Sequence, residues 1–330
     1  MEKSETRIGR SATALRREPV IKVRGLRKSY GEQIVLDGID LDVAEGTIFS
    51  LLGPNGAGKT TAVQILSTLI GADGGEAQVF GHDVARDPDG VRAAIGVTGQ
   101  FSAVDNLLTG EENLILMSDL RHLGRREGQR RAAELLERFD LVEAARKPPV
   151  TYSGGMRRRL DLAMTLIGNP RIIFLDEPTA GLDPRSRRVM WRIIRDLVAG
   201  GVTIFLTTQY LEEADELADR VAVLDGGQFV AEGTPDELKR LVPGGHVRLR
   251  FADKGGLETA AFALSDGSRD DEALTMQIPT DGGFPSLKNL IDRLDENSVP
   301  VEELSLHTPD LDDVFLALTD KPDPQKGVSR

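Results

Sequence analysis

The sequence predicts a doubly wound α/β fold built around a mainly parallel sheet. Short apolar runs of the kind found in buried strands alternate with segments of helical periodicity, as at 171–175 and 202–207. A further apolar run, 47–52, leads into a glycine-rich turn that opens another helical pattern. Repeated strand–helix units favour a parallel sheet covered by helices, with ligands bound at the carboxyl ends of its strands.

The glycine-rich turn predicts a phosphate-binding loop. It reads Gly53, Pro54, Asn55, Gly56, Ala57, Gly58, Lys59, Thr60 and Thr61, and fits the pattern G-x-x-x-x-G-K-[ST] between a strand and a helix. Its glycines allow backbone N–H groups to face a polyphosphate at the positive end of the following helix. We expect Lys59 to reach the β- and γ-phosphates and Thr60 to bind Mg²⁺. A glycine-rich turn without a ligand is the alternative, and the strand–helix context disfavours it.

Two adjacent carboxylates, Asp176 and Glu177, end the apolar run at 171–175. Next to a phosphate loop, Asp176 is expected to hold Mg²⁺, and Glu177 to orient and deprotonate the attacking water. An acidic pair that only caps the next turn is the alternative. The phosphate loop favours the catalytic interpretation.

Composition excludes several classes of protein. The net charge of -12 over 330 residues argues against a general nucleic-acid binder, which is usually basic over its binding face. The chain has no cysteine, so neither a disulfide framework nor a thiolate metal site is available. Residues 1–18 lack the apolar core of a secretory signal, and no apolar run approaches the length of a bilayer span. We therefore expect any membrane role to be peripheral.

The chain divides into two folded parts between flexible ends. We expect flexible tails at 1–18 and 321–330, a nucleotide-binding part at 19–243, and a small α+β domain at 244–320. The last part is set apart by charge, because residues 245–330 hold 17 acidic against 9 basic residues, which gives -8 of the total of -12. Its expected strands lie at 246–251, 274–278 and 301–305, and its expected helices at 286–297 and 309–318. A helical insert is expected at about 101–165, where Thr109 and Glu112 make a capping box.

A second glycine-containing motif, Tyr152-Ser153-Gly154-Gly155-Met156, precedes the helical pattern that ends near 167. Ser153 can cap that helix, and the glycines can expose N–H groups to a γ-phosphate. The motif resembles the Leu-Ser-Gly-Gly-Gln signature of ATP-binding cassette (ABC) proteins. The resemblance covers most of residues 20–243 in the family's motif order. It implies a P-loop NTPase cassette with a RecA-like parallel sheet core, an antiparallel β subdomain and a helical insert, followed here by the small α+β domain.

The resemblance also implies roles for single residues. Tyr30 matches the aromatic residue that stacks on adenine, and Gln100 matches the glutamine that senses Mg²⁺ and the nucleophilic water. Asp183 belongs to the loop that contacts the partner subunit. Gln209 stands where the family usually has a histidine beside the γ-phosphate, and its amide can donate a hydrogen bond but cannot titrate near neutrality. In this family two chains sandwich two nucleotides, each bound by the phosphate loop of one chain and the signature of the other.

Three segments, 152–161, 207–211 and 311–319, are similar to the daunorubicin-resistance type of ABC exporter ATPase. That resemblance implies a homodimeric ATPase that uses ATP and Mg²⁺. It would power the export of hydrophobic drugs, antibiotics or lipid-like compounds through a separate membrane permease, at the cytoplasmic face of the membrane. We interpret the three arginines at 157–159 as a solvated helix face.

Two other functions stay open from the sequence. A soluble ABC ATPase acting on ribosomes or nucleic acid is disfavoured by the acidic charge, by the single cassette, and by the short, heptad-free stretch of about 90 residues between the two glycine motifs. A protein that binds ATP without turnover is expected to have lost Lys59, Asp176 or Glu177, and all three are present.

Overall fold

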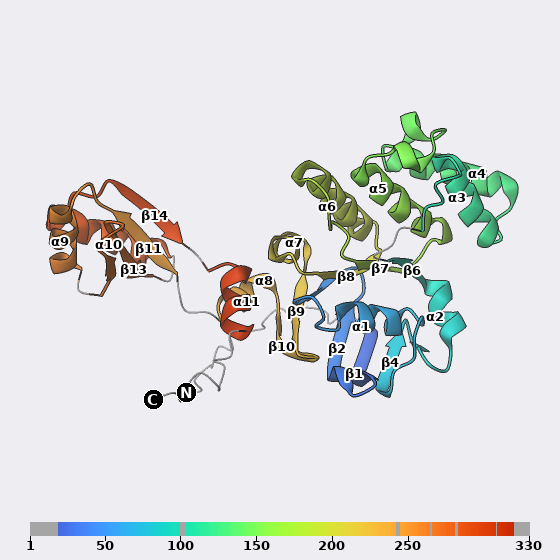
Figure 1. Cartoon of the computed structure of the whole chain (residues 1–330), viewed down its shortest axis with the longest axis horizontal. Helices are drawn as coiled ribbons and strands as arrows, with labels where there is room; N and C mark the ends of the chain where they lie inside the picture. Colours follow the sequence, from blue (N-terminus) through green and yellow to red (C-terminus); the bar gives the residue numbers. More distant parts are fainter. Residues whose placement is uncertain are drawn as a thin grey trace, which may run out of the picture. The chain divides into compact units, whose positions relative to one another are not determined.

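A computed structural model describes most of the chain (Figure 1). The described residues are 19–99, 103–241, 245–264, 266–280, 283–307 and 309–319. They form two compact units. The first contains the residues up to Gln209 together with 226–228, and the second contains 210–225 and the residues from 229 onward.

Four parallel strands form the core sheet of the first unit, in the order β3-β8-β7-β6. Their bounds are β3 Ile48–Leu52, β6 Ile95–Thr98, β7 Ile172–Asp176 and β8 Thr203–Thr208. Every residue of β3, β7 and β8 is buried, as expected for strands covered on both faces. Phe49 and Phe174 each lie with their ring centroid 5.5 Å from that of Phe205. The predicted parallel core is confirmed.

An antiparallel sheet with the order β2-β1-β4-β5 belongs to the same unit. Its strands are β1 Pro19–Tyr30, β2 Gln33–Ala44, β4 Gly74–Val79 and β5 His82–Asp83. Strand β1 runs from a buried first half, with Ile21 and Val23 in the core, to a largely exposed end at Tyr30. In the second half of β2, Ile39, Leu41 and Val43 are buried while Asp40 and Asp42 are exposed, which is the pattern of a strand with one solvated face.

The α-helices among the described residues of the first unit are α1 Lys59–Leu66, α2 Pro88–Ala94, α3 Gly110–Leu120, α4 Arg125–Arg138, α5 Gly154–Thr165 and α6 Pro184–Ala199. The capping box at the start of α3 is present, with Thr109 accepting from the Glu112 amide and the Glu112 carboxylate accepting from the Thr109 amide. Helices α3, α4 and α5 pack on one another and form the helical insert (Figure 1).

The second unit begins with α7 Leu211–Leu217, β9 Arg220–Asp225, β10 Gln228–Gly233 and α8 Pro235–Lys239. It continues with β11 His246–Arg250, α9 Lys254–Ala263, β12 Ser268–Asp270, β13 Thr275–Pro279, α10 Phe284–Glu296, β14 Glu303–His307 and α11 Leu311–Thr319. Strands β12-β13-β11-β14 form an antiparallel sheet in that order. Strand β14 begins two residues later than expected, and α9 is a helix that the sequence pattern did not predict.

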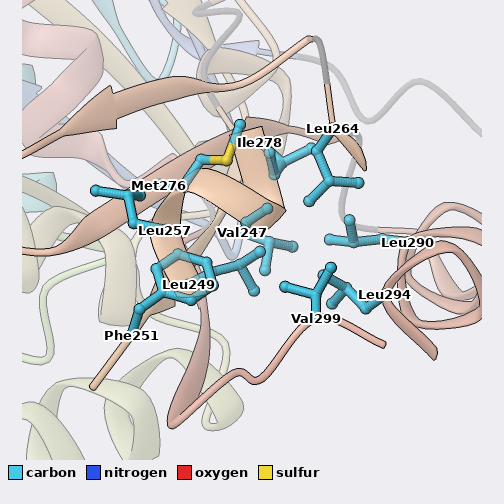
Figure 2. Close-up of a cluster of buried hydrophobic side chains, with 11 residues drawn as sticks. Val247, Leu249, Phe251, Leu257, Leu264, Met276, Ile278, Leu290, Leu294 and Val299 are labelled. Atoms are coloured by element: carbon cyan, nitrogen blue, oxygen red, sulfur yellow. The ribbon is translucent and has the colours of Figure 1, made fainter. Parts of the chain in front are cut away.

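The α+β part of the second unit has its own hydrophobic core (Figure 2). Alternate residues of β11 and β13 point into it, including Val247, Leu249 and Ile278. Leu257 of α9 and Leu290 of α10 pack against them, and all five side chains are buried. A core of this kind is what lets such a small domain fold.

Helix α11 packs against α8 and α7 within the second unit. Its Leu311 and Val314 are buried. The last helix of the described chain therefore returns to the segment that precedes the α+β sheet. Among the described residues, no helix combines the length and the apolar character needed to cross a bilayer.

Candidate nucleotide-binding site

The phosphate loop connects buried strand β3 to helix α1, as the sequence predicts. Gly58 is the N-cap of α1 and has φ +106°. A Cβ atom at Gly58 would lie 2.7 Å from the Val35 carbonyl oxygen and 2.9 Å from the Leu36 side chain. Both its backbone conformation and its neighbours therefore require glycine here.

Lys59 is held inside the loop by its own main chain. Its ammonium Nζ donates to the carbonyl oxygens of Gly53 at 2.7 Å and Pro54 at 3.0 Å, and lies 3.9 Å from Glu177 Oε1. Burial lowers the pKa of Lys59, while the nearby charges of Glu177 and Asp176 oppose that shift. The lysine is thus partly desolvated, and an anionic phosphate would add to the counter-charge that Glu177 and Asp176 supply.

Hydroxyl and carboxylate oxygens meet beside the loop. Thr60 Oγ1 donates to Asp176 Oδ1 at 3.3 Å, and Thr207 Oγ1 donates to the same oxygen at 2.5 Å. Asp176 is 3% exposed. Hard oxygen donors of this type suit Mg²⁺, which usually takes one or two protein ligands and completes its shell with phosphate and water. The described residues hold no cluster of three or more His, Asp or Glu side chains that could bind a metal without a phosphate.

Glu177 adopts an uncommon backbone conformation. Its φ is +49°, in the left-handed region that costs a non-glycine residue about 1–2 kcal/mol. Its amide is placed within hydrogen-bonding distance of the Thr207 carbonyl, at 3.1 Å, and of Thr207 Oγ1, at 3.2 Å. These contacts fix the main chain directly after β7, and the carboxylate stays close to Lys59.

A cavity of about 580 Å³ joins these parts. It is lined by Gln33, Val35, Asn55, Gly56, Gly58, Lys59, Thr60, Thr61, Glu177 and Gln209. Gln209 therefore shares this cavity with Lys59 and Glu177. Gln33 and Val35 were not predicted, because only the pairing of β1 with β2 brings them to the loop. A larger cavity of about 720 Å³, at the start of β1, contains none of the predicted site residues.

Tyr30 does not line the phosphate-loop cavity. It ends β1 opposite Gln33, its side chain is half exposed, and Lys28 Nζ lies 5.5 Å from its ring centroid. Gln100 lies outside the described residues.

The signature residues line a separate cavity of about 220 Å³. Ser153 is the N-cap of α5 and accepts from the Met156 amide at 3.2 Å. The cavity includes Ser153 and Gly155 and shares no lining residue with the phosphate-loop cavity. A Cβ atom at Gly155 would lie 2.6 Å from Ser186 Oγ, so the glycine allows α5 to approach α6.

Asp183 caps α6 next to the signature. It accepts from the amides of Arg185 and Ser186, each at 3.0 Å, and from Ser186 Oγ at 2.6 Å. The hydrogen bonds from Ser186, followed by that from Arg185, hold the pKa of the Asp183 carboxyl below its usual range. Asp183 binds Ser186, which lines the signature cavity together with Ser153 and Gly155. Asp183 does not line the phosphate-loop cavity.

The interpretation of the three arginines as a solvated face is wrong for two of them. Arg158 Nε donates to the Pro178 carbonyl at 3.0 Å, and Arg159 Nη1 donates to the Phe139 carbonyl at 2.7 Å. Their side chains are 14% and 16% exposed. Carbonyls at the ends of strands and helices lack a hydrogen-bond donor within the regular structure, and these guanidinium groups donate to them instead.

The first strand of the parallel sheet opens a glycine-rich loop onto a helix. Lys59 and Glu177 line the cavity at this loop, and Asp176 lies beside it, bound to Thr60. This arrangement defines a P-loop nucleotide-binding protein. The profile of the family described as "ABC transporter" matches residues 36–180. The chain is 50% identical over 304 residues to "Daunorubicin resistance ATP-binding protein DrrA2" of Streptomyces coeruleorubidus. This match covers 91% of this chain and 94% of the relative. It is 44% identical over 313 residues to "Doxorubicin resistance ATP-binding protein DrrA" of Mycobacterium tuberculosis, with 92% and 94% covered.

One similar solved structure is a dimeric, post-hydrolysis ATP-binding cassette with ADP and Pi. It shows 28% identity and a TM-score of 0.60, and the match covers 65% of this chain and 98% of that one. The chain belongs to the ABC transporter family, as a nucleotide-binding ATPase of the daunorubicin-resistance type. The predicted cassette fold is thereby confirmed.

Proposed function

We propose that this ATPase energises the export of hydrophobic drugs, antibiotics or lipid-like compounds through a separate membrane permease. The names of the two relatives support this cargo, since each is a resistance protein that matches over more than 90% of this chain. The proposal places the cassette at the cytoplasmic face of the membrane, bound to the permease. A role on ribosomes or nucleic acid has no comparable support.

The observation that carries the proposal is one cavity lined by Lys59, Thr60, Glu177 and Gln209, with Asp176 bound to Thr60 beside it. Lys59 would bind the β- and γ-phosphates, Glu177 would activate water, and the Gln209 amide would donate to the γ-phosphate. Thr60 and Asp176 would hold Mg²⁺, which would neutralise charge developing on the phosphate oxygens. Gln100 would assist at the metal and the water, and Tyr30 would stack on adenine.

A second observation supports a homodimer. Ser153 and Gly155 of the signature line one cavity of the chain, and the phosphate loop lines another. Two copies in head-to-tail arrangement would place the signature of one over the nucleotide bound by the other. Asp183, which caps α6 beside the signature, would then lie at the subunit contact. Hydrolysis would separate the two copies, and the permease would change its access to the two sides of the membrane.

Transport is tested by purifying the tagged chain from detergent-solubilised membranes of its source cells. We expect a multi-spanning membrane protein to co-purify, and the complex, reconstituted in vesicles, to move daunorubicin in an ATP-dependent manner. The same complex carrying Glu177→Gln is the control and should not transport. Consistent recovery with ribosomes or DNA in place of a membrane protein would overturn the proposal.

A further inference from the structure

Arg158 connects the signature helix to the strand that carries the catalytic carboxylates. It lies on α5, five positions after Ser153, and its guanidinium reaches the end of β7. Nη2 donates to the Asp176 carbonyl at 2.9 Å and to the Glu177 carbonyl at 3.4 Å, and Nε donates to the Pro178 carbonyl at 3.0 Å. Three consecutive carbonyls are therefore held by one side chain.

The same guanidinium reaches the end of the neighbouring strand. Arg158 Nη1 donates to the Gly99 carbonyl at 3.0 Å, one residue beyond the end of β6. Strands β6 and β7 are paired in parallel. The ladder between these two strands ends at Thr98 and Leu175, although Asp176 still pairs with Thr207 of β8. The carbonyls beyond that ladder on the β6 side need other donors. A planar group with five N–H donors can satisfy several of them together, which a lysine ammonium cannot do in the same geometry.

Asp161 extends this connection. It is 2% exposed and lies one turn after Arg158 on α5, with Oδ2 3.4 Å from Arg158 Nη1. Its Oδ1 accepts from the Ala103 amide at 3.1 Å. Arg158 and Asp161 thus bind Gly99 and Ala103, which flank the predicted Gln100 segment in the sequence.

The hydrogen bonds from Arg158 do not involve the carboxylate of Glu177. Arg158 binds only the main-chain oxygen of Glu177, and its carboxylate lines the cavity near Lys59. The main chain at this point is in the costly left-handed region. Such a conformation persists only when several contacts impose it. The Thr207 contacts to the amide, the Ala180 amide at 3.2 Å from the carbonyl, and Arg158 are those contacts.

We propose that Arg158 is a positioning residue for ATP hydrolysis. It holds the main chain at 176–178 so that the Glu177 carboxylate faces the attacking water, and it ties that geometry to the helix that begins at the signature serine. The inference rests on the proposed role of Glu177 as the base. A displacement of the base by about 1 Å can cost about 100-fold in rate, so loss of this support should reduce turnover without removing the nucleotide-binding loop.

The test compares ATP turnover of purified full-length Arg158→Gln and Arg158→Lys, each with and without Glu177→Gln. We expect kcat of Arg158→Gln to fall about 10- to 100-fold, with KM for ATP changed less than about threefold. Arg158→Lys should give an intermediate kcat, because an ammonium reaches fewer of the carbonyls. In the Glu177→Gln background, hydrolysis is slow and is measured under single-turnover conditions. There, Arg158→Gln should lower the remaining rate less than about twofold. The two effects are not additive because Arg158 and Glu177 act as a unit.

The matched control is Arg131→Gln. Arg131 on α4 also donates to a main-chain carbonyl, that of Leu166 at 3.0 Å, but it does not touch β7. We expect its kcat to stay within about twofold of the parent.

Several outcomes would overturn the inference: equal kcat in Arg158→Gln and the parent, an equal loss in both Glu177 backgrounds, or a loss confined to KM. If thermal unfolding of Arg158→Gln is not cooperative, that variant is not correctly folded. The kcat and KM of Arg158→Lys are then judged against the parent by the same criteria. Absence of hydrolysis in the parent would contradict the proposed function itself, and this inference with it.

Discussion

Replacing Glu177 by Gln is expected to lower the rate of ATP hydrolysis by about 10²- to 10⁴-fold, the usual contribution of a general base. Glutamine keeps the size of the side chain but cannot take a proton from water. ATP binding should persist, because the phosphate loop is untouched and one negative charge leaves a cavity that receives an anion. The measurement is kcat and the dissociation constant for ATP, on the purified full-length chain.

Two further variants make that result specific. Gln209→Ala should weaken hydrolysis more than ATP binding, because Gln209 lines the cavity, where we propose that its amide donates to the γ-phosphate. Equal losses in both quantities would reject that role. Glu232→Gln is the matched control, since Glu232 pairs with Arg220 at 2.9 Å and lines no part of the nucleotide cavity. If Glu177→Gln hydrolyses ATP at the parental rate, Glu177 is not the base.

Replacing Lys59 by Ala is expected to weaken ATP binding by about 10- to 150-fold, equal to about 1.5–3 kcal/mol for a hydrogen bond to a charged group. The loss has two sources. The phosphates lose their buried cation, and the carbonyls of Gly53 and Pro54 lose the ammonium that holds them. Titration calorimetry with ATP and Mg²⁺ measures the change.

Lys239→Ala controls for the loss of a lysine ion pair as such. Lys239 pairs with Asp215 at 2.6 Å and has no part in the cavity, so ATP affinity should stay within about twofold of the parent. Parental affinity in a correctly folded Lys59→Ala protein would contradict the assignment of the phosphate loop.

The parts of the fold that could be predicted from the sequence are those whose structure is determined by residues close together in the chain. The phosphate loop, the buried parallel strands and the capping box at Thr109 each depend on neighbouring residues. Helix α9 was not predicted because Gly255 and Gly256 stand in its first turn, and glycine disfavours helix. Asp253 compensates by capping the Gly256 amide, and Leu257 is buried in the core (Figure 2).

The parts of the site that escaped prediction depend on contacts between distant segments. Gln33 and Val35 reach the cavity only through sheet pairing, and no local pattern marks them. Arg158 lies in a run of three arginines whose pattern is that of an exposed helix face. Only the packing of α5 against β6 brings its guanidinium to the carbonyls of Gly99 and Asp176. One local signal is Leu162, an apolar residue one turn after Arg158 on α5, which is buried.

The most direct measurement is the molar mass of full-length Glu177→Gln by sedimentation or light scattering, with and without ATP and Mg²⁺. We expect the 35.8 kDa chain to be monomeric without nucleotide and to reach twice that mass with ATP. Ser153→Arg in the same chain should prevent the doubling while the phosphate loop still binds ATP. If Glu177→Gln stays monomeric at saturating ATP, even when bound to its membrane partner, two chains do not share the nucleotide.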